Sequence, residues 1–113
     1  GVDDGEGFTV NCPLSAGAGD KEMLHIFNKE LPIAISGFKP DFILISAGFD
    51  AHRDDPLASL SVTDDGFSEM TTIVKGLAET YCRGRIVSCL EGGYNFSALA
   101  QSVGRHIEVL AGV

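Results

Sequence analysis

The sequence predicts an α/β fold, a parallel sheet with flanking helices. Two apolar stretches, residues 42–47 and 85–90, have the length and composition of strands. Helical periodicity fills the segments before, between and after them. An order in which strands alternate with helices predicts parallel strands, because the chain crosses back over the sheet between one strand and the next.

The first elements are a strand and a helix. Residues 8–11, Phe-Thr-Val-Asn, are predicted to form a short strand. Asp20 is the predicted cap of a helix whose apolar positions recur at helical spacing. Pro32 lies inside this helix and predicts a kink or a division into two helices. Gly37 and Pro40 mark its end.

The later elements follow the same alternation. They are predicted at residues 42–47, 65–81, 85–90 and 97–110. Thr63 or Asp64 is the predicted cap of the helix over 65–81. The apolar run 42–49 is typical of a buried parallel strand. No linker or internal repeat interrupts the pattern, which indicates one domain.

Composition restricts the classes of function. The chain has 113 residues, is 44% hydrophobic and 21% charged, and is predicted to be one soluble globular domain. Its net charge of −8 and the lack of a basic run argue against nucleic-acid binding, whereas cationic partners such as histone tails or polyamines fit it. No apolar stretch is long enough to cross a membrane.

Three cysteines, Cys12, Cys82 and Cys89, are too scattered for a zinc ribbon or a disulfide framework and are predicted to be reduced, buried thiols. A cytoplasmic or nuclear location follows. The chain begins at Gly1 without methionine, in a glycine-rich polar lead, and this start is expected of a piece of a longer protein.

The first candidate site residue is Asp50. It closes the apolar run and opens a polar loop, and ligands of open α/β sheets gather at the carboxyl ends of strands. Gly92 and Gly93 precede Tyr94 after the next strand. Glycines allow close approach of the backbone to a substrate, and a phenol can donate a hydrogen bond to a developing oxyanion.

Other readings of the two loops stay open. Asp50 and His52 could both reach one zinc ion, but an Asp-x-His pair alone is weak, and an exposed His52 is at least as well supported. Asp54 and Asp55 before a proline are interpreted as turn formers. Glu91 is either a general base or a hydrogen-bond acceptor for loop amides.

A complete zinc site is not predicted within these residues. Catalytic zinc needs three protein ligands and an open position. His25 and His106 fall within predicted helices, where solvated or packed side chains are expected. Nucleotide binding at residues 17–20 is disfavoured, since Asp20 sits at the helix start and no Walker lysine follows.

Three motifs together resemble one family. They are Asn11-Cys12-Pro13-Leu14 with Gly17-Ala18-Gly19-Asp20, the segment from Pro40 to Leu57, and Leu90-Glu91-Gly92-Gly93-Tyr94-Asn95. In this order and spacing they resemble the carboxyl-terminal part of the zinc-dependent histone deacetylase superfamily. The sequence of these motifs is most similar to the class II and bacterial deacetylase-like branch of the superfamily, which includes acetylpolyamine amidohydrolases. The resemblance covers essentially the whole chain.

The resemblance implies an arginase-like α/β fold in which loops form a tunnel to one zinc ion. Asp50 matches the family's second aspartate ligand. Tyr94 matches the tyrosine that stabilises the oxyanion. Leu57 matches an apolar residue of the tunnel rim, and Gly92 and Gly93 match glycines beside the tunnel floor. His52 does not match a zinc ligand.

The same resemblance implies that residues 1–113 are the carboxyl-terminal segment of one catalytic domain. The family's Asp-x-His ligands and its histidine dyad match nothing here, so one Asp and one His ligand are expected upstream. The implied reaction is amide hydrolysis of acetyl-lysine or an acetylpolyamine, with this segment inactive alone. The alternative is a truncated, non-catalytic assembly or binding module with the same half-fold, which could form a homo-oligomer.

Overall fold

The structure, a computed structural model, describes every residue from Gly1 to Val113. The elements in chain order are a short 3-10 helix η1 (Asp3–Gly5), α1 (Asp20–Phe38), β1 (Ile43–Ala47), α2 (Asp64–Cys82), β2 (Ile86–Leu90) and α3 (Phe96–Ala111). The two strands pair in parallel, with Ile43 opposite Ile86 and Ala47 opposite Leu90. The predicted parallel α/β fold is therefore confirmed.

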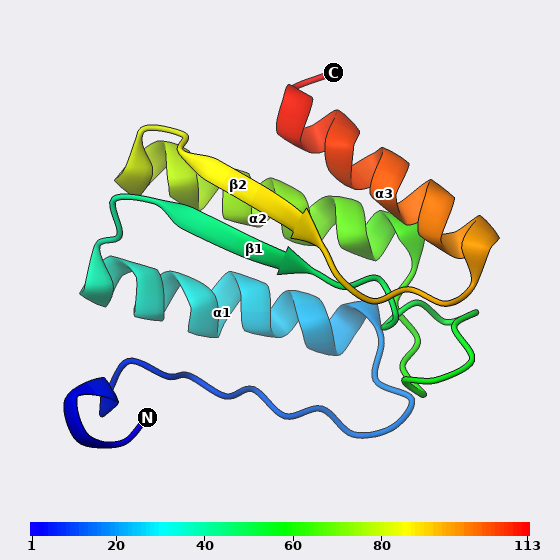
Figure 1. Cartoon of the computed structure of the whole chain (residues 1–113), viewed down its shortest axis with the longest axis horizontal. Coiled ribbons are helices and arrows are strands. Elements are labelled where there is room, and N and C mark those ends of the chain that lie inside the picture. The colour runs from blue at the N-terminus through cyan, green and yellow to red at the C-terminus, as the bar shows by residue number, and fades with distance from the viewer.

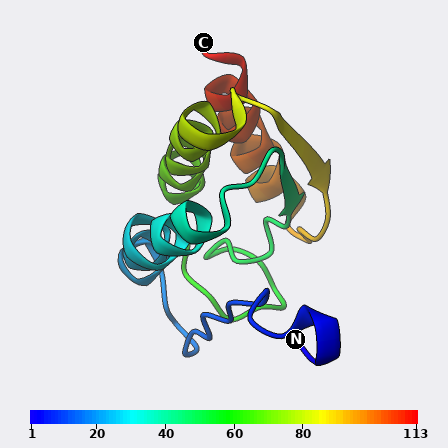
Figure 2. The ribbon, with the colours of Figure 1, turned by 90° about the vertical axis from the view of Figure 1, so that its left-hand side faces the viewer.

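All three α-helices cover the same face of the two strands (Figures 1 and 2). The core lies between that face and the helices, with Ala47, Phe49, Val62, Phe67 and Met70 as its buried cluster. The rings of Phe49 and Phe67 pack with their centroids 5.0 Å apart. Phe49 lies just beyond β1, so the core extends to the carboxyl end of the sheet.

The opposite face of the sheet is open. Burial alternates along β1, with Ile45 partly buried in the core and Leu44 73% exposed. Val87 of β2 is 44% exposed on the same side. The apolar run had predicted a strand buried on both faces, and this is wrong for the chain by itself, because every helix packs on one side.

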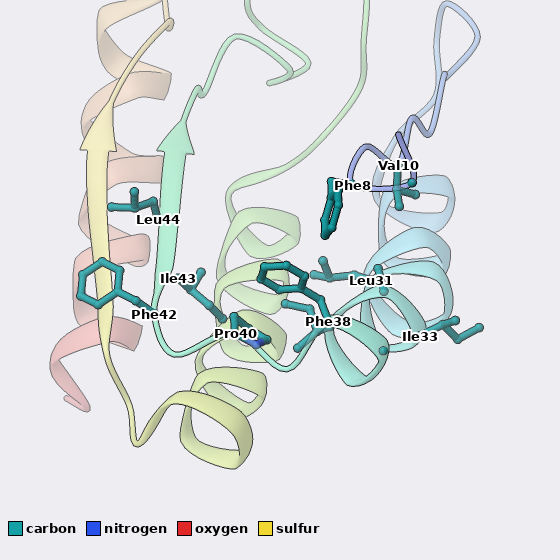
Figure 3. A pocket seen from close by; sticks show the side chains of 13 residues that line it. Phe8, Val10, Leu31, Ile33, Phe38, Pro40, Phe42, Ile43 and Leu44 are labelled. Atoms are coloured by element: carbon teal, nitrogen blue, oxygen red, sulfur yellow. The ribbon is translucent and has the colours of Figure 1, made fainter. Parts of the chain in front are cut away.

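The predicted strand over residues 8–11 is also wrong. This segment is extended but has no strand partner, and strand structure depends on hydrogen bonds to a neighbour that a local pattern cannot supply. Phe8 instead packs edge-on against Phe38 at the end of α1, with ring centroids 6.0 Å apart. Both rings line an apolar groove that continues to Pro40 and Ile43 (Figure 3).

Helix α1 begins differently from the prediction. Gly19 is its N-cap, and the Gly19 N–H donates to Glu22 Oε2 at 2.9 Å. Asp20 does not cap α1. Its Oδ1 accepts from the Thr63 N–H at 2.8 Å and its Oδ2 from the Thr63 hydroxyl at 2.6 Å. Asp20 thus ties the start of α1 to the start of α2.

The start of α2 agrees with the sequence, and the start of α3 shows a cap that had not been predicted. Thr63 caps α2 by accepting from the Gly66 N–H, as predicted, and Asn95 caps α3 by accepting from the Ala98 N–H. Pro32 lies within α1, which runs on to Phe38 as one helix, so division into two helices is wrong.

No helix of the chain combines the length and the apolar character required for a membrane span.

The three cysteines are all free, as predicted. Cys82 is fully buried, and its thiol donates to the Pro40 carbonyl oxygen at 3.2 Å. Cys12 is half-buried. Cys89 is exposed, contrary to the prediction of a buried thiol, because its side chain lies on the strand face that no helix covers.

A buried histidine joins α3 to α2 and β2. The Thr71 hydroxyl donates to the Phe67 carbonyl at 2.7 Å, so it can only accept from His106 Nδ1–H, 2.8 Å away. His106 Nε2 then accepts from the Ser88 hydroxyl at 2.8 Å. This neutral tautomer satisfies both ring nitrogens, and burial lowers the pKa of His106 below its ordinary value of 6.5.

Acidification should therefore destabilise the fold through His106. As the pH falls below 6.5, the unfolded chain takes up a proton at this histidine, whereas the folded chain resists protonation because its pKa is lower. The contribution of neutral His106 to the free energy of unfolding is therefore fully present above pH 6.5 and is lost as the pH falls through the folded-state pKa. We expect the free energy of unfolding, measured with urea, to fall less between about pH 7.5 and about pH 5.5 in His106→Gln than in the unsubstituted chain. His25→Gln, at an exposed position on α1, is the control. An equal loss in all three proteins would contradict the assignment.

Candidate active site at the carboxyl ends of β1 and β2

The loops that follow the two strands are held together by main-chain hydrogen bonds. The Glu91 N–H donates to the Ala47 carbonyl at 2.9 Å, and the Phe49 N–H donates to the Gly92 carbonyl at 2.8 Å. Both loops leave the sheet at the same edge (Figure 1), as parallel strands require. Residues distant in sequence, 48–57 and 91–95, therefore form one surface.

Asp50 is half-buried in a turn three residues beyond the end of β1, rather than on the strand itself. Its carboxylate lies against the backbone of the neighbouring loop: a Cβ at Gly92 would lie 3.0 Å from Asp50 Cγ and Oδ2. No side-chain hydrogen bond or salt bridge of the chain uses this carboxylate. The same carboxylate also packs near Gly48, where a Cβ would lie 2.9 Å from Asp50 Oδ1.

The two glycines before Tyr94 suit this packing. A Cβ at Gly92 would crowd the Asp50 carboxylate, so that the carboxylate would have to shift. Gly93 has a φ of +145°, and a Cβ there would lie 2.6 Å from Leu99 Cδ1. Gly92 therefore allows the β2 loop to approach Asp50 closely, and Gly93 allows the positive φ just before Tyr94.

Tyr94 and Leu57 are brought to the same rim. Their side chains are 54% and 65% exposed. The Tyr94 N–H donates to Asp55 Oδ2 at 2.8 Å, and the Leu57 N–H donates to Asp55 Oδ1 at 2.9 Å. The structure thus places an exposed phenol and an exposed apolar side chain on two loops joined through one carboxylate.

His52 is neither exposed nor available as a ligand, which corrects both readings of it. It is 3% exposed, and its ring stacks on Phe67 with centroids 6.4 Å apart. Nδ1 accepts from the Asp54 N–H at 3.0 Å. Nε2 lies 3.2 Å from Asp64 Oδ1 without making a hydrogen bond. His52 points into the protein and supports the loop from below.

No other groups complete a metal site. No cluster of three or more His, Cys, Asp or Glu side chains could hold an ion. As predicted, His25 is solvated and His106 is packed. Glu91 is exposed, and its carboxylate accepts no hydrogen bond from a loop amide, so that reading of Glu91 is wrong. Asp50 remains a candidate on sequence grounds, with no second ligand beside it among these residues.

Sequence reasoning missed the role of Asp55. Its bond to the Leu57 N–H, two residues on, is the turn that the Asp-Asp-Pro pattern predicts. Its second bond reaches the Tyr94 N–H, 39 residues away. No local signal reports a contact over that distance.

Comparisons with known proteins identify the family of the chain. The histone deacetylase domain matches residues 1–110. Histone deacetylase 14, chloroplastic, of Arabidopsis thaliana is 44% identical over 108 residues, which are 96% of this chain and 26% of the relative. A probable deacetylase of Archaeoglobus fulgidus is 44% identical over 95 residues, 84% of this chain and 26% of the relative.

Solved structures show the same fold. The crystal structure of the HDA15 HD domain superposes with a TM-score of 0.88 at 44% identity, covering 99% of this chain and 31% of that one. The histone deacetylase Clr3 gives a TM-score of 0.80 at 30% identity, covering 88% of this chain and 16% of that one. The chain spans about a quarter to a third of the length of the first relatives it matches.

The fold defines an α/β protein in which two loops meet at the carboxyl ends of parallel strands. More specifically, the chain belongs to the histone deacetylase family. This confirms the resemblance drawn from the three sequence motifs.

Proposed function

We propose that residues 1–113 are the carboxyl-terminal segment of a zinc-dependent deacetylase domain that hydrolyses the acetyl amide of acetyl-lysine or of an acetylpolyamine. The observation that carries the proposal is the uncommitted Asp50 carboxylate packed against Gly92, beside Gly93 and Tyr94, in a chain of this family. The net charge of −8 suits a cationic substrate.

Asp50 would supply one zinc ligand. A half-buried carboxylate that makes no bond within the chain fits this role. The family resemblance implies one further Asp and one His ligand upstream of these residues. Zinc, when bound, would polarise the acetyl carbonyl and activate water. Residues of the two loops would supply the other contacts with the substrate.

Tyr94 would act on the acetyl carbonyl oxygen. Its phenol O–H would donate a hydrogen bond that strengthens as negative charge develops on that oxygen. Gly92 and Gly93 keep the surface next to Asp50 free of side chains, so an acetyl group could approach closely. Leu57 at the exposed rim would contact the apolar methylene chain that carries the acetylated nitrogen.

The open face of the sheet supports a larger domain. Leu44 and Val87 are exposed there, and the edges of both strands are unpaired. Apolar strand faces are normally covered in parallel sheets. Further chain that supplied the missing ligands would also cover this face. The free cysteines fit a reducing compartment such as the cytoplasm or the nucleus.

The same open face favours one alternative, a non-catalytic module in which a second copy covers Leu44 and Val87. Unpaired strand edges allow a homo-oligomer of this kind. Such a module would fold without metal and would be indifferent to Asp50 and Tyr94.

The test compares the 113-residue chain with a form extended upstream to include an Asp-x-His segment. Zinc content and hydrolysis of a fluorogenic acetyl-lysine amide are measured for both. We expect zinc and activity in the extended form alone. Activity in the short chain would show that local groups complete the site. Absence of zinc and activity from both, with a stable metal-free oligomer, would favour the non-catalytic module.

A further inference from the structure

Asp55 joins the two loops of the site through both oxygens of its carboxylate. Its Oδ1 accepts from the Leu57 N–H at 2.9 Å, and its Oδ2 accepts from the Tyr94 N–H at 2.8 Å. Both carboxylate oxygens are therefore engaged, each by the backbone of a residue at the rim. One oxygen of the Asp55 carboxylate thus binds the backbone of the rim residue Leu57, and the other binds the backbone of the proposed oxyanion donor Tyr94.

The loop that carries Asp55 has a rigid base. The Asp55 N–H donates to the His52 carbonyl at 3.0 Å, and buried His52 accepts the Asp54 N–H through Nδ1. Asn95 Nδ2 donates to the Asp54 carbonyl at 3.1 Å, while Asn95 Oδ1 caps α3. Tyr94 and Asn95 are thus both hydrogen-bonded to residues 54–55, and Asn95 is also the N-cap of α3.

We propose that Asp55 is a positioning residue of the deacetylase site, which sets where the Tyr94 phenol stands relative to Leu57 and Asp50. This inference rests on the proposed function. The arrangement requires a carboxylate, because each of its two oxygens faces a backbone N–H donor. Asparagine would keep the shape but turn an NH₂ group toward one of those donors, and that contact would be lost.

The test uses the upstream-extended domain with Asp55→Asn, Tyr94→Phe and the double substitution. We expect Asp55→Asn to lower kcat by up to about 100-fold, since a misplaced catalytic group has an effect of that order, with zinc content unchanged. In the Tyr94→Phe background, Asp55→Asn should lower kcat no further, because the hydroxyl it positions is gone. Asp65→Asn is the matched control, since this carboxylate is 78% exposed and only faces Arg105 at 3.7 Å.

Each result separates the two proposals. An undiminished kcat in Asp55→Asn, or a full additional loss in the Tyr94→Phe background, overturns the positioning role while leaving the deacetylase proposal standing. An undiminished kcat in Tyr94→Phe overturns the assignment of Tyr94 itself. A purely structural defect would lower kcat in both backgrounds and so counts against positioning.

A measurement on the unsubstituted domain covers the case in which Asp55→Asn does not fold. The Tyr94 and Leu57 amides belong to exposed residues, yet both donate to Asp55. Hydrogen exchange at these two amides should be slowed relative to an unstructured chain. Exchange at the unstructured rate would show that the Asp55 contacts are not maintained in solution and would overturn the inference.

Discussion

Asp50→Asn is expected to remove zinc from the upstream-extended domain while leaving the fold intact. The amide has almost the shape of the carboxylate, so it still fits against Gly92, and no hydrogen bond within the chain depends on the lost charge. A neutral amide oxygen is a far poorer zinc ligand than a carboxylate. Since even residues that only orient ligands cost about 10- to 100-fold in metal affinity, we expect a loss of at least about 100-fold.

Zinc affinity is measured by competition with a chelator, and folding by the thermal midpoint with the chelator present. Asp41→Asn is the control, because this exposed carboxylate lies just before β1, at the opposite end of the strand from Asp50. Hydrolysis should fall with zinc occupancy in Asp50→Asn and stay unchanged in Asp41→Asn. Unaltered zinc affinity in Asp50→Asn would remove Asp50 from the ligand set.

Elements with local signals could be predicted from the sequence. The predicted cap Thr63 acts on an amide three residues away, and the stripe of α2 repeats every three to four residues. Such signals lie within one turn of helix and depend little on the rest of the fold. The meeting of Asp50 with the β2 loop was also predictable, because the carboxyl ends of parallel strands share one edge.

Features that depend on distant partners could not be predicted. The segment 8–11 has a strand-like pattern but no neighbour to pair with. His52 follows the pattern of an exposed loop residue in the sequence, but in the structure its ring stacks on Phe67 of α2. The apolar composition of β1 predicts burial on both faces, but the helices pack on one face alone and Leu44 on the other is exposed.

Tyr94→Phe gives the second large expected effect. The substitution removes one hydroxyl from an exposed ring and leaves the Tyr94 N–H bond to Asp55 in place, so the loop should keep its conformation. If the phenol donates to the developing oxyanion, kcat of the upstream-extended domain should fall by about 100- to 1,000-fold, as when other enzymes lose one oxyanion donor. Zinc content should not change, because Asp50 is untouched.

The chain provides a matched control in Tyr81, the other of its two tyrosines, which lies near the end of α2 and away from the site. Tyr81→Phe removes the same hydroxyl and should leave kcat unchanged. A transition-state role also predicts that KM changes little while kcat falls, since a bond that forms only as charge develops adds nothing to substrate binding. A raised KM with an unchanged kcat would instead make Tyr94 a substrate-binding residue, and the oxyanion would then need a different donor.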